Sequence, residues 1–120
     1  MPDGSLQGRR ILIVEDQYFL ADDMRADFEQ AGAEVIGPVG RISDALELLE
    51  SVELLDGAVL DINLAGEMVY AVADVLRARR VPFVFATGYD AEIIPATYAG
   101  VTSCRKPIEP AKVARALFGP

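Results

Sequence analysis

Three short apolar runs constrain the fold of this chain more than any other feature of its sequence. They span residues 11–14, 57–60 and 82–86, and none of them contains a polar residue. A strand with one face in solvent alternates apolar and polar side chains, whereas a strand covered on both faces has no need to alternate. The runs therefore predict strands of a parallel sheet that is covered on both sides.

The segments between these runs change to the spacing of amphipathic helices. Leu20, Met24 and Phe28 recur at every fourth position, which predicts a helix over residues 17–31 that ends at Gly32. The same reasoning predicts four further helices: one from a cap at Ser43 or Asp44 to residue 52, and three over residues 67–79, 90–99 and 109–118.

Two weaker strands complete the pattern. Residues 35–36 form a short apolar pair that Gly37-Pro38 should end, and residues 101–104 precede Lys106-Pro107. Pro95 lies inside the fourth predicted helix and should shorten or bend it, because proline lacks a backbone donor and clashes with the preceding turn. Five strands thus alternate with five helices.

This alternation predicts an α/β fold, a five-stranded parallel sheet with helices on both faces. The chain has 120 residues, of which 52% are hydrophobic, and this is enough for one core but hardly for two. We therefore expect a single domain over residues 1–120, with its core at about residues 9–118.

Composition excludes several classes of function. A formal net charge of −8 repels phosphate backbones, so we expect no nucleic-acid partner. Without histidine there is no histidine zinc site and no Ser-His-Asp triad. No apolar run approaches the ~20 residues of a membrane span, and residues 1–10 do not resemble a secretory signal. A single Cys104 suits a reducing compartment, so we expect a cytoplasmic protein with no membrane association.

Polar side chains follow four of the predicted strands. Glu15-Asp16, Asp61, Thr87 and Lys106 each stand just after a strand. In open parallel sheets, sites form at the carboxyl ends of the strands, so these residues should converge at one edge.

Each of these residues also has an ordinary structural interpretation. Asp16 could cap the helix that follows, Asp61 could belong to a turn, and Thr87 could simply be a strand former before a glycine. Lys106 could be a surface lysine, although the chain has only two lysines against nine arginines. Three carboxylates at one edge would repel one another, and a divalent cation is the simplest relief.

Taken together, these positions resemble the receiver domain of two-component response regulators, over nearly the whole chain. The resemblance implies the flavodoxin-like (βα)5 receiver fold. Residues 85–88, Phe-Ala-Thr-Gly, further resemble a subset of stand-alone regulators that are linked to an unorthodox class of sensor histidine kinases.

The resemblance implies a role for each residue. Asp61 would be the phosphoacceptor, and Glu15, Asp16, Asp61 and the backbone carbonyl of Asn63 would hold Mg²⁺. Thr87 would hydrogen-bond a phosphoryl oxygen and Lys106 would pair with the phosphate. Pro107 would follow a cis peptide bond.

The same resemblance implies the partners and the output. The phosphoryl donor would be a sensor histidine kinase or a phosphotransfer protein, and the output would pass to a downstream protein target. The chain would be a signalling phosphoacceptor with slow self-catalysed dephosphorylation rather than an enzyme. The output face would comprise the predicted fourth helix, fifth strand and fifth helix.

Three departures from the family pattern lie near this output face. Ser103 stands where many receivers have a switch aromatic, so Tyr89 or Tyr98 becomes the candidate replacement. The loop over residues 62–67 is short and lacks the usual proline, and Pro95 interrupts the fourth helix.

Three alternatives remain open at this point. An aspartate-nucleophile phosphatase usually has a second aspartate two residues after the first, where this chain has Asn63. A flavin or nucleotide module would have a phosphate loop where Glu15-Asp16 stands. A degenerate receiver that acts only as an adaptor would not need Asp61, Thr87 and Lys106. The chain could be a stand-alone receiver or part of a longer protein.

Overall fold

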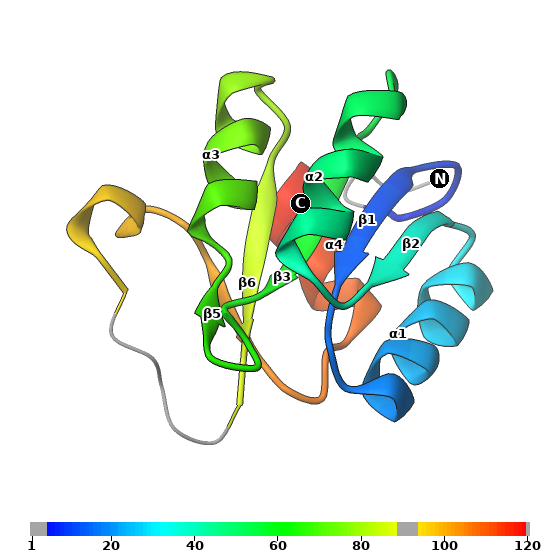
Figure 1. Cartoon of the computed structure of the whole chain (residues 1–120). Helices are drawn as coiled ribbons and strands as arrows, with labels where there is room; N and C mark the ends of the chain where they lie inside the picture. The colour runs from blue at the N-terminus through cyan, green and yellow to red at the C-terminus, as the bar shows by residue number, and fades with distance from the viewer. Residues whose placement is uncertain (1–4, 89–93, 120) are drawn as a thin grey trace.

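The computed structural model describes residues 5–88 and 94–119 of the chain. Its main sheet has five parallel strands in the spatial order β2-β1-β3-β6-β7 (Figure 1). Their bounds are β1 Arg10–Val14, β2 Glu34–Val39, β3 Gly57–Asp61, β6 Phe83–Thr87 and β7 Ser103–Arg105. This confirms the parallel α/β sheet that the unbroken apolar runs predict.

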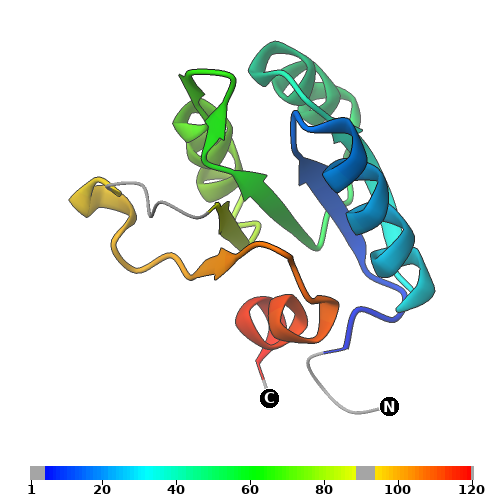
Figure 2. The ribbon, with the colours of Figure 1, turned by 90° about the horizontal axis from the view of Figure 1, so that it is seen from below.

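Side chains of the central strands alternate between two separate cores. Leu12 and Val14 of β1 pack in one core, whereas Ile11 and Ile13 pack in the other, and all four are at most 1% exposed. Helices α2 (Ile42–Ser51) and α3 (Tyr70–Ala78) cover the first core. Helices α1 (Tyr18–Gln30) and α4 (Pro110–Phe118) cover the second. Figure 2 shows α3 and α4 on opposite sides of the sheet.

Helix α1 follows its sequence pattern closely. Met24 and Phe28 are buried against the sheet, and the chain leaves the helix at Gly32, whose φ of 96° is a conformation that glycine adopts without steric cost. A Cβ at Gly32 would also lie 2.3 Å from Gln7 Oε1, so the N-terminal segment packs directly against this turn.

Two predicted boundaries were wrong. Helix α2 begins at Ile42 after an extended Arg41 that makes no side-chain capping hydrogen bond, so neither Ser43 nor Asp44 is its cap. Strand β2 does not end at Gly37-Pro38 but continues through a cis peptide bond to Val39, with a register shift against β1. A proline is tolerated there because β2 is an edge strand of the sheet, where one side needs no ladder donor.

The segment after β3 also differs from its prediction. The predicted helix at 67–79 begins at Tyr70 instead, because a small antiparallel hairpin precedes it. The hairpin consists of β4 (Asn63–Leu64) and β5 (Glu67–Met68). Ala65 and Gly66 form its turn with φ values of 52° and 95°. Positive φ at both turn residues is typical of a two-residue hairpin.

The region between β6 and β7 holds little regular structure among the described residues. Of the helix predicted at 90–99, only the 3-10 turn η1 (Ala96–Tyr98) is present in the described part, directly after Pro95. Residues 89–93 lie outside the described residues. None of the helices within residues 5–88 and 94–119 combines the length and the apolar character that a membrane span requires.

Candidate functional site

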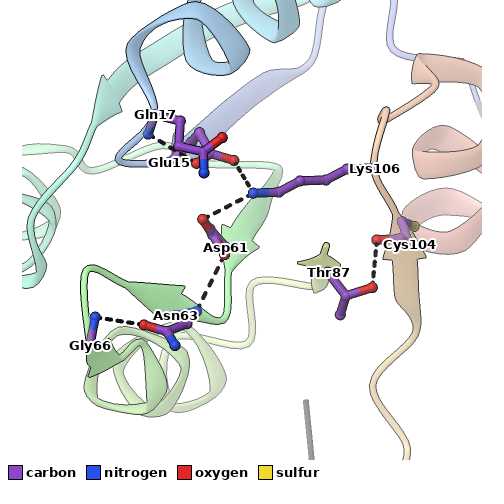
Figure 3. Close-up of polar contacts among 8 residues, drawn as sticks. All are labelled: Glu15, Gln17, Asp61, Asn63, Gly66, Thr87, Cys104 and Lys106. Carbon is purple, nitrogen blue, oxygen red and sulfur yellow. Dashed lines mark hydrogen bonds and ion pairs between the residues drawn. The ribbon is translucent and has the colours of Figure 1, made fainter. Parts of the chain in front are cut away.

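The carboxyl ends of β1, β3 and β7 bring together a glutamate, an aspartate and a lysine (Figure 3). Glu15 follows the last residue of β1, Asp61 is the last residue of β3, and Lys106 follows the last residue of β7. Glu15 is 2% exposed and Asp61 is 8% exposed, and they are the buried charged residues of the described core. A buried carboxylate is costly unless it is paired, so this burial marks the site.

Lys106 pairs with both buried carboxylates. Its Nζ lies 2.7 Å from Glu15 Oε1 and 3.1 Å from Asp61 Oδ2. The contact with Asp61 is a hydrogen bond, whereas Glu15 Oε1 receives no hydrogen bond of good geometry from the described residues despite the short distance. The interaction of Lys106 with Glu15 is therefore an ion pair, and the hydrogen-bonding capacity of the buried Glu15 Oε1 is not fully used.

The charges of this cluster are strongly coupled. Burial raises the pKa of Glu15, and the nearby Asp61 adds to this rise, while Lys106 and the Gln17 amide oppose it. Burial by itself lowers the pKa of Lys106, but the two close carboxylates of Glu15 and Asp61 outweigh burial, so the net shift of this pKa is upward. The ammonium is therefore held in its charged form by the two acids.

A divalent cation fits the donor set of this edge. Glu15, Asp16 and Asp61 each offer a carboxylate oxygen, and these oxygens lie within 4.8 Å of one another. Three carboxylates face one ammonium, so the cluster keeps excess negative charge. All of the candidate ligands are oxygen atoms, which a hard cation such as Mg²⁺ prefers. One of them, Glu15 Oε1, is buried and lacks a good hydrogen bond from the described residues. The prediction that these acids converge is confirmed, and the ion itself stays a prediction.

Backbone donors orient the two buried carboxylates. Gln17 N–H donates to Glu15 Oε2 at 3.1 Å, and Asn63 N–H donates to Asp61 Oδ1 at 3.3 Å. The Asn63 side chain accepts a 2.7 Å hydrogen bond from Gly66 N–H in the hairpin turn. Gln17 and Gly66 could not be predicted from the sequence, because main-chain donors carry no residue-type signal.

Thr87 lies at the same edge, but its hydroxyl does not join the acidic cluster. Figure 3 shows the hydroxyl turned away from Asp61, and it donates to the Cys104 carbonyl at 3.5 Å, the long limit of a hydrogen bond. The Thr87 carbonyl accepts a 2.9 Å hydrogen bond from Lys106 N–H. The backbones of these two residues are therefore joined across β6 and β7.

The structure describes Ser103, which stands at the position of the usual switch aromatic, and Tyr98, one of its two candidate replacements. Ser103 is exposed on β7, and Tyr98 is 5% exposed and stacks on Tyr70 with ring centroids 5.0 Å apart. The other candidate, Tyr89, lies outside the described residues. Cys104 is half-buried, and the Lys106–Pro107 peptide bond is cis, as predicted.

Comparisons with known proteins identify the family. No protein-family model matches the sequence, and no curated protein matches it. Solved structures do match. SdrG from Sphingomonas melonis Fr1 is 35% identical, with 94% of this chain and 95% of that chain covered and a TM-score of 0.79.

Two further structures carry the family in their names. A response regulator receiver protein from Sinorhizobium medicae WSM419 is 27% identical, with 94% of each chain covered and a TM-score of 0.74. A CheY-like response regulator receiver domain from Methylobacillus flagellatus is 26% identical, with 88% of this chain and 92% of that chain covered and a TM-score of 0.71. With this fold, this edge of converging acids and these relatives, the chain belongs to the receiver domains of two-component response regulators.

Proposed function

We propose that this chain accepts a phosphoryl group on Asp61, in a Mg²⁺-dependent reaction, from a phosphohistidine of a sensor histidine kinase or phosphotransfer protein. One observation carries the proposal: the Asp61 carboxylate lies at the end of β3 with Lys106 Nζ 3.1 Å from one oxygen and Asn63 N–H 3.3 Å from the other. Two directional contacts hold the carboxylate in place, and an oriented nucleophile is what phosphoryl transfer requires.

The transfer step exchanges one bond to phosphorus for another. A carboxylate oxygen of Asp61 attacks phosphorus and forms an acyl phosphate, while the bond from phosphorus to the donor's imidazole nitrogen breaks and its electron pair returns to the ring. These 120 residues contain no histidine, so the donor imidazole lies outside them.

Glu15, Asp16 and Asp61, with the backbone carbonyl of Asn63, are the residues that would hold Mg²⁺. When bound, the ion would neutralise negative charge on the phosphoryl oxygens. The raised pKa of Glu15 reflects the cost of burying this carboxylate, and excess acid at the site favours a cation over a free anion.

Lys106 and Thr87 supply the remaining contacts to the phosphoryl group. The Lys106 ammonium already lies between Glu15 and Asp61, where it would pair with the added phosphate. The Thr87 hydroxyl would leave its long contact with the Cys104 carbonyl for a phosphoryl oxygen, because a charged acceptor forms the stronger hydrogen bond. This movement would carry the signal to the face formed by η1, β7 and α4, and so to a downstream protein.

Slow loss of the phosphoryl group to water would reset the chain, so the proposed role is that of a signalling phosphoacceptor rather than a turnover enzyme. The structure of the loop supports this choice over a phosphatase, because Asn63, two residues after Asp61, directs its side chain to Gly66. It offers no carboxylic acid to a leaving group.

The test is phosphorylation by a small donor. Wild type, Asp61→Asn and Asp27→Asn are incubated with acetyl phosphate, with Mg²⁺ or with a chelator, and their intact masses are measured. Asp27 is an exposed aspartate of α1 and serves as the matched control.

We expect wild type and Asp27→Asn to gain one phosphoryl group in Mg²⁺ only, and Asp61→Asn to gain none. A wild type that stays unmodified, or an Asp61→Asn variant that gains the group equally, would contradict the proposal. If wild type gained the phosphoryl group in chelator, only the proposed Mg²⁺ dependence would be contradicted.

A further inference from the structure

The loop after Asp61 is a hairpin whose tip is fixed by one side chain. Asn63 pairs with Met68, and Leu64 pairs with Glu67, across the turn at Ala65 and Gly66. The Asn63 Oδ1 accepts a 2.7 Å hydrogen bond from the Gly66 N–H, which crosses this turn (Figure 3).

The turn needs this support because it is strained. Ala65 has a φ of 52°, and this left-handed conformation costs roughly 1 kcal/mol for a residue with a Cβ. A two-stranded hairpin is also marginal by itself in water. Neither Ala65 nor Gly66 is buried, so packing does not hold the tip.

The base of the hairpin has support of its own. Ile62, Leu64 and Val69 are at most 4% exposed, and Val69 N–H donates to the Ile62 carbonyl at 2.9 Å. The buried base and the exposed tip therefore depend on different interactions, and the bond from Asn63 to Gly66 acts on the tip.

Asn63 links this tip to the proposed phosphoacceptor. Its backbone N–H donates to Asp61 Oδ1 at 3.3 Å while its side chain bonds Gly66, so one residue contacts both the carboxylate and the turn. The bond to Asp61 is near the long limit of a hydrogen bond, so a shift of a few tenths of an ångström at Asn63 would break it.

We infer that the Asn63 side chain is a positioning residue for Asp61, an inference that rests on the proposed function. By fixing the turn through Gly66, it holds the backbone of Asn63 where the N–H orients the Asp61 carboxylate. The side chain itself bonds Gly66, and only the backbone N–H of Asn63 bonds the Asp61 carboxylate. Its effect passes through the main chain.

The experiment compares four full-length proteins: wild type, Asn63→Ala, Asn63→Asp and Arg79→Ala. Asn63→Asp keeps an oxygen that can accept the Gly66 N–H. Arg79→Ala removes contacts at the far end of α2 and controls for a general loss of stability. Initial rates of mass gain are measured over a range of acetyl phosphate concentrations in Mg²⁺, and amide hydrogen exchange is measured at Gly66.

We expect Asn63→Ala to react about tenfold more slowly at saturating acetyl phosphate, because a displaced nucleophile loses rate rather than donor affinity. Its Gly66 amide should exchange about tenfold faster, since the acceptor of that N–H is gone. Asn63→Asp should restore the reaction rate and the Gly66 exchange rate to within about twofold of wild type. Arg79→Ala should keep the wild-type rate despite its lower stability.

Three results would overturn the inference: Asn63→Ala reacting at the wild-type rate, Asn63→Asp reacting as slowly as Asn63→Ala, or Arg79→Ala showing the same loss of rate. A wild type that gains no phosphoryl group would instead defeat the proposed function, and this inference with it. The two failures are therefore distinguishable in the same experiment.

Discussion

The Lys106 ammonium lies 2.7 Å from a carboxylate oxygen of Glu15, although the two residues come from opposite ends of the sequence. The Glu15 side chain is fully buried and that of Lys106 is 15% exposed, so the pair is shielded from solvent on the side of the acid. The same ammonium also bonds Asp61. When no metal is bound, Lys106 is therefore the residue that compensates the negative charges of Glu15 and Asp61 in the proposed site.

We predict that Lys106→Met lowers the free energy of unfolding by about 3 kcal/mol in chelator, because it leaves two buried carboxylates without their cation. Mg²⁺ should restore part of this loss. The chain's other lysine supplies the control: Lys112 is 66% exposed and pairs with Glu109 on the surface of α4, so Lys112→Met should change stability little. Urea unfolding with and without Mg²⁺ measures both variants, and equal losses in the two would contradict the prediction.

The pKa of Glu15 predicts a pH dependence of stability. Because burial raises this pKa above 4.5, the folded state keeps the proton longer than the unfolded chain. The contribution of this group is fully present below pH 4.5 and is lost as pH rises through the raised folded value. In chelator, wild type should therefore lose stability relative to Glu15→Gln as pH rises from 4.5 toward 7.

Glu109 serves as a control, because its titration should change stability with pH in the opposite direction to that of Glu15. Its pKa is lowered by Lys112, so its contribution is present above pH 4.5 and is lost as pH falls through the lowered folded value. Wild type should lose stability relative to Glu109→Gln below pH 4.5. Unfolding curves at several pH values test both slopes, and two slopes of the same sign would refute the assignment for Glu15.

Arg79 should be a main stabiliser of the end of α2. Its guanidinium donates to the carbonyls of Leu49, Val52 and Glu53 at distances of 2.8, 2.7 and 3.0 Å. Arg79→Ala leaves these partners unpaired and should lower the free energy of unfolding by about 2 kcal/mol. Arg79→Lys should recover only part of this, because an ammonium lacks the planar fork. Chemical denaturation measures the series, and full recovery by lysine would contradict the geometry.

The Tyr98 phenol should titrate late. It is buried, it donates to the Asp74 carboxylate, and these surroundings raise its pKa to about 12. The phenol therefore supports folding fully below pH 10 and loses this contribution as pH rises toward 12. The absorbance of phenolate in wild type minus that in Tyr98→Phe isolates this residue. A difference curve with its midpoint near 10 would show that the ring is not held as described.

The sheet and its acidic edge could be predicted from the sequence because their signals are local. Unbroken apolar runs mark strands covered on both faces, and polar residues just after such runs must lie at the carboxyl edge. Glu15, Asp61 and Lys106 were placed correctly for this reason, and the structure adds their pairing.

Other features depend on backbone geometry that residue types do not report. The hairpin at Asn63–Met68 shortened the predicted third helix, since its turn has an alanine where glycine or asparagine is usual. The direction of the Thr87 hydroxyl was equally unpredictable, because it depends on one side-chain rotation. Pro95 predicted a shortened or bent helix over residues 90–99; the described part of that segment holds only the 3-10 turn after Pro95, and residues 90–93 lie outside the described residues.

Lys106 follows the short edge strand β7, so its backbone is held by fewer strand pairings than the backbones of Glu15 and Asp61. Glu15 and Asp61 follow or end β1 and β3, each of which has a paired strand on both sides, whereas β7 pairs with β6 alone, over three residues. Edge segments with few ladder bonds open locally at lower cost than central strands. Glu15 and Asp61 are therefore held by central strands, whereas Lys106 follows an edge strand, and this difference would allow Lys106 to shift toward the negative charge that the proposed phosphorylation adds to Asp61.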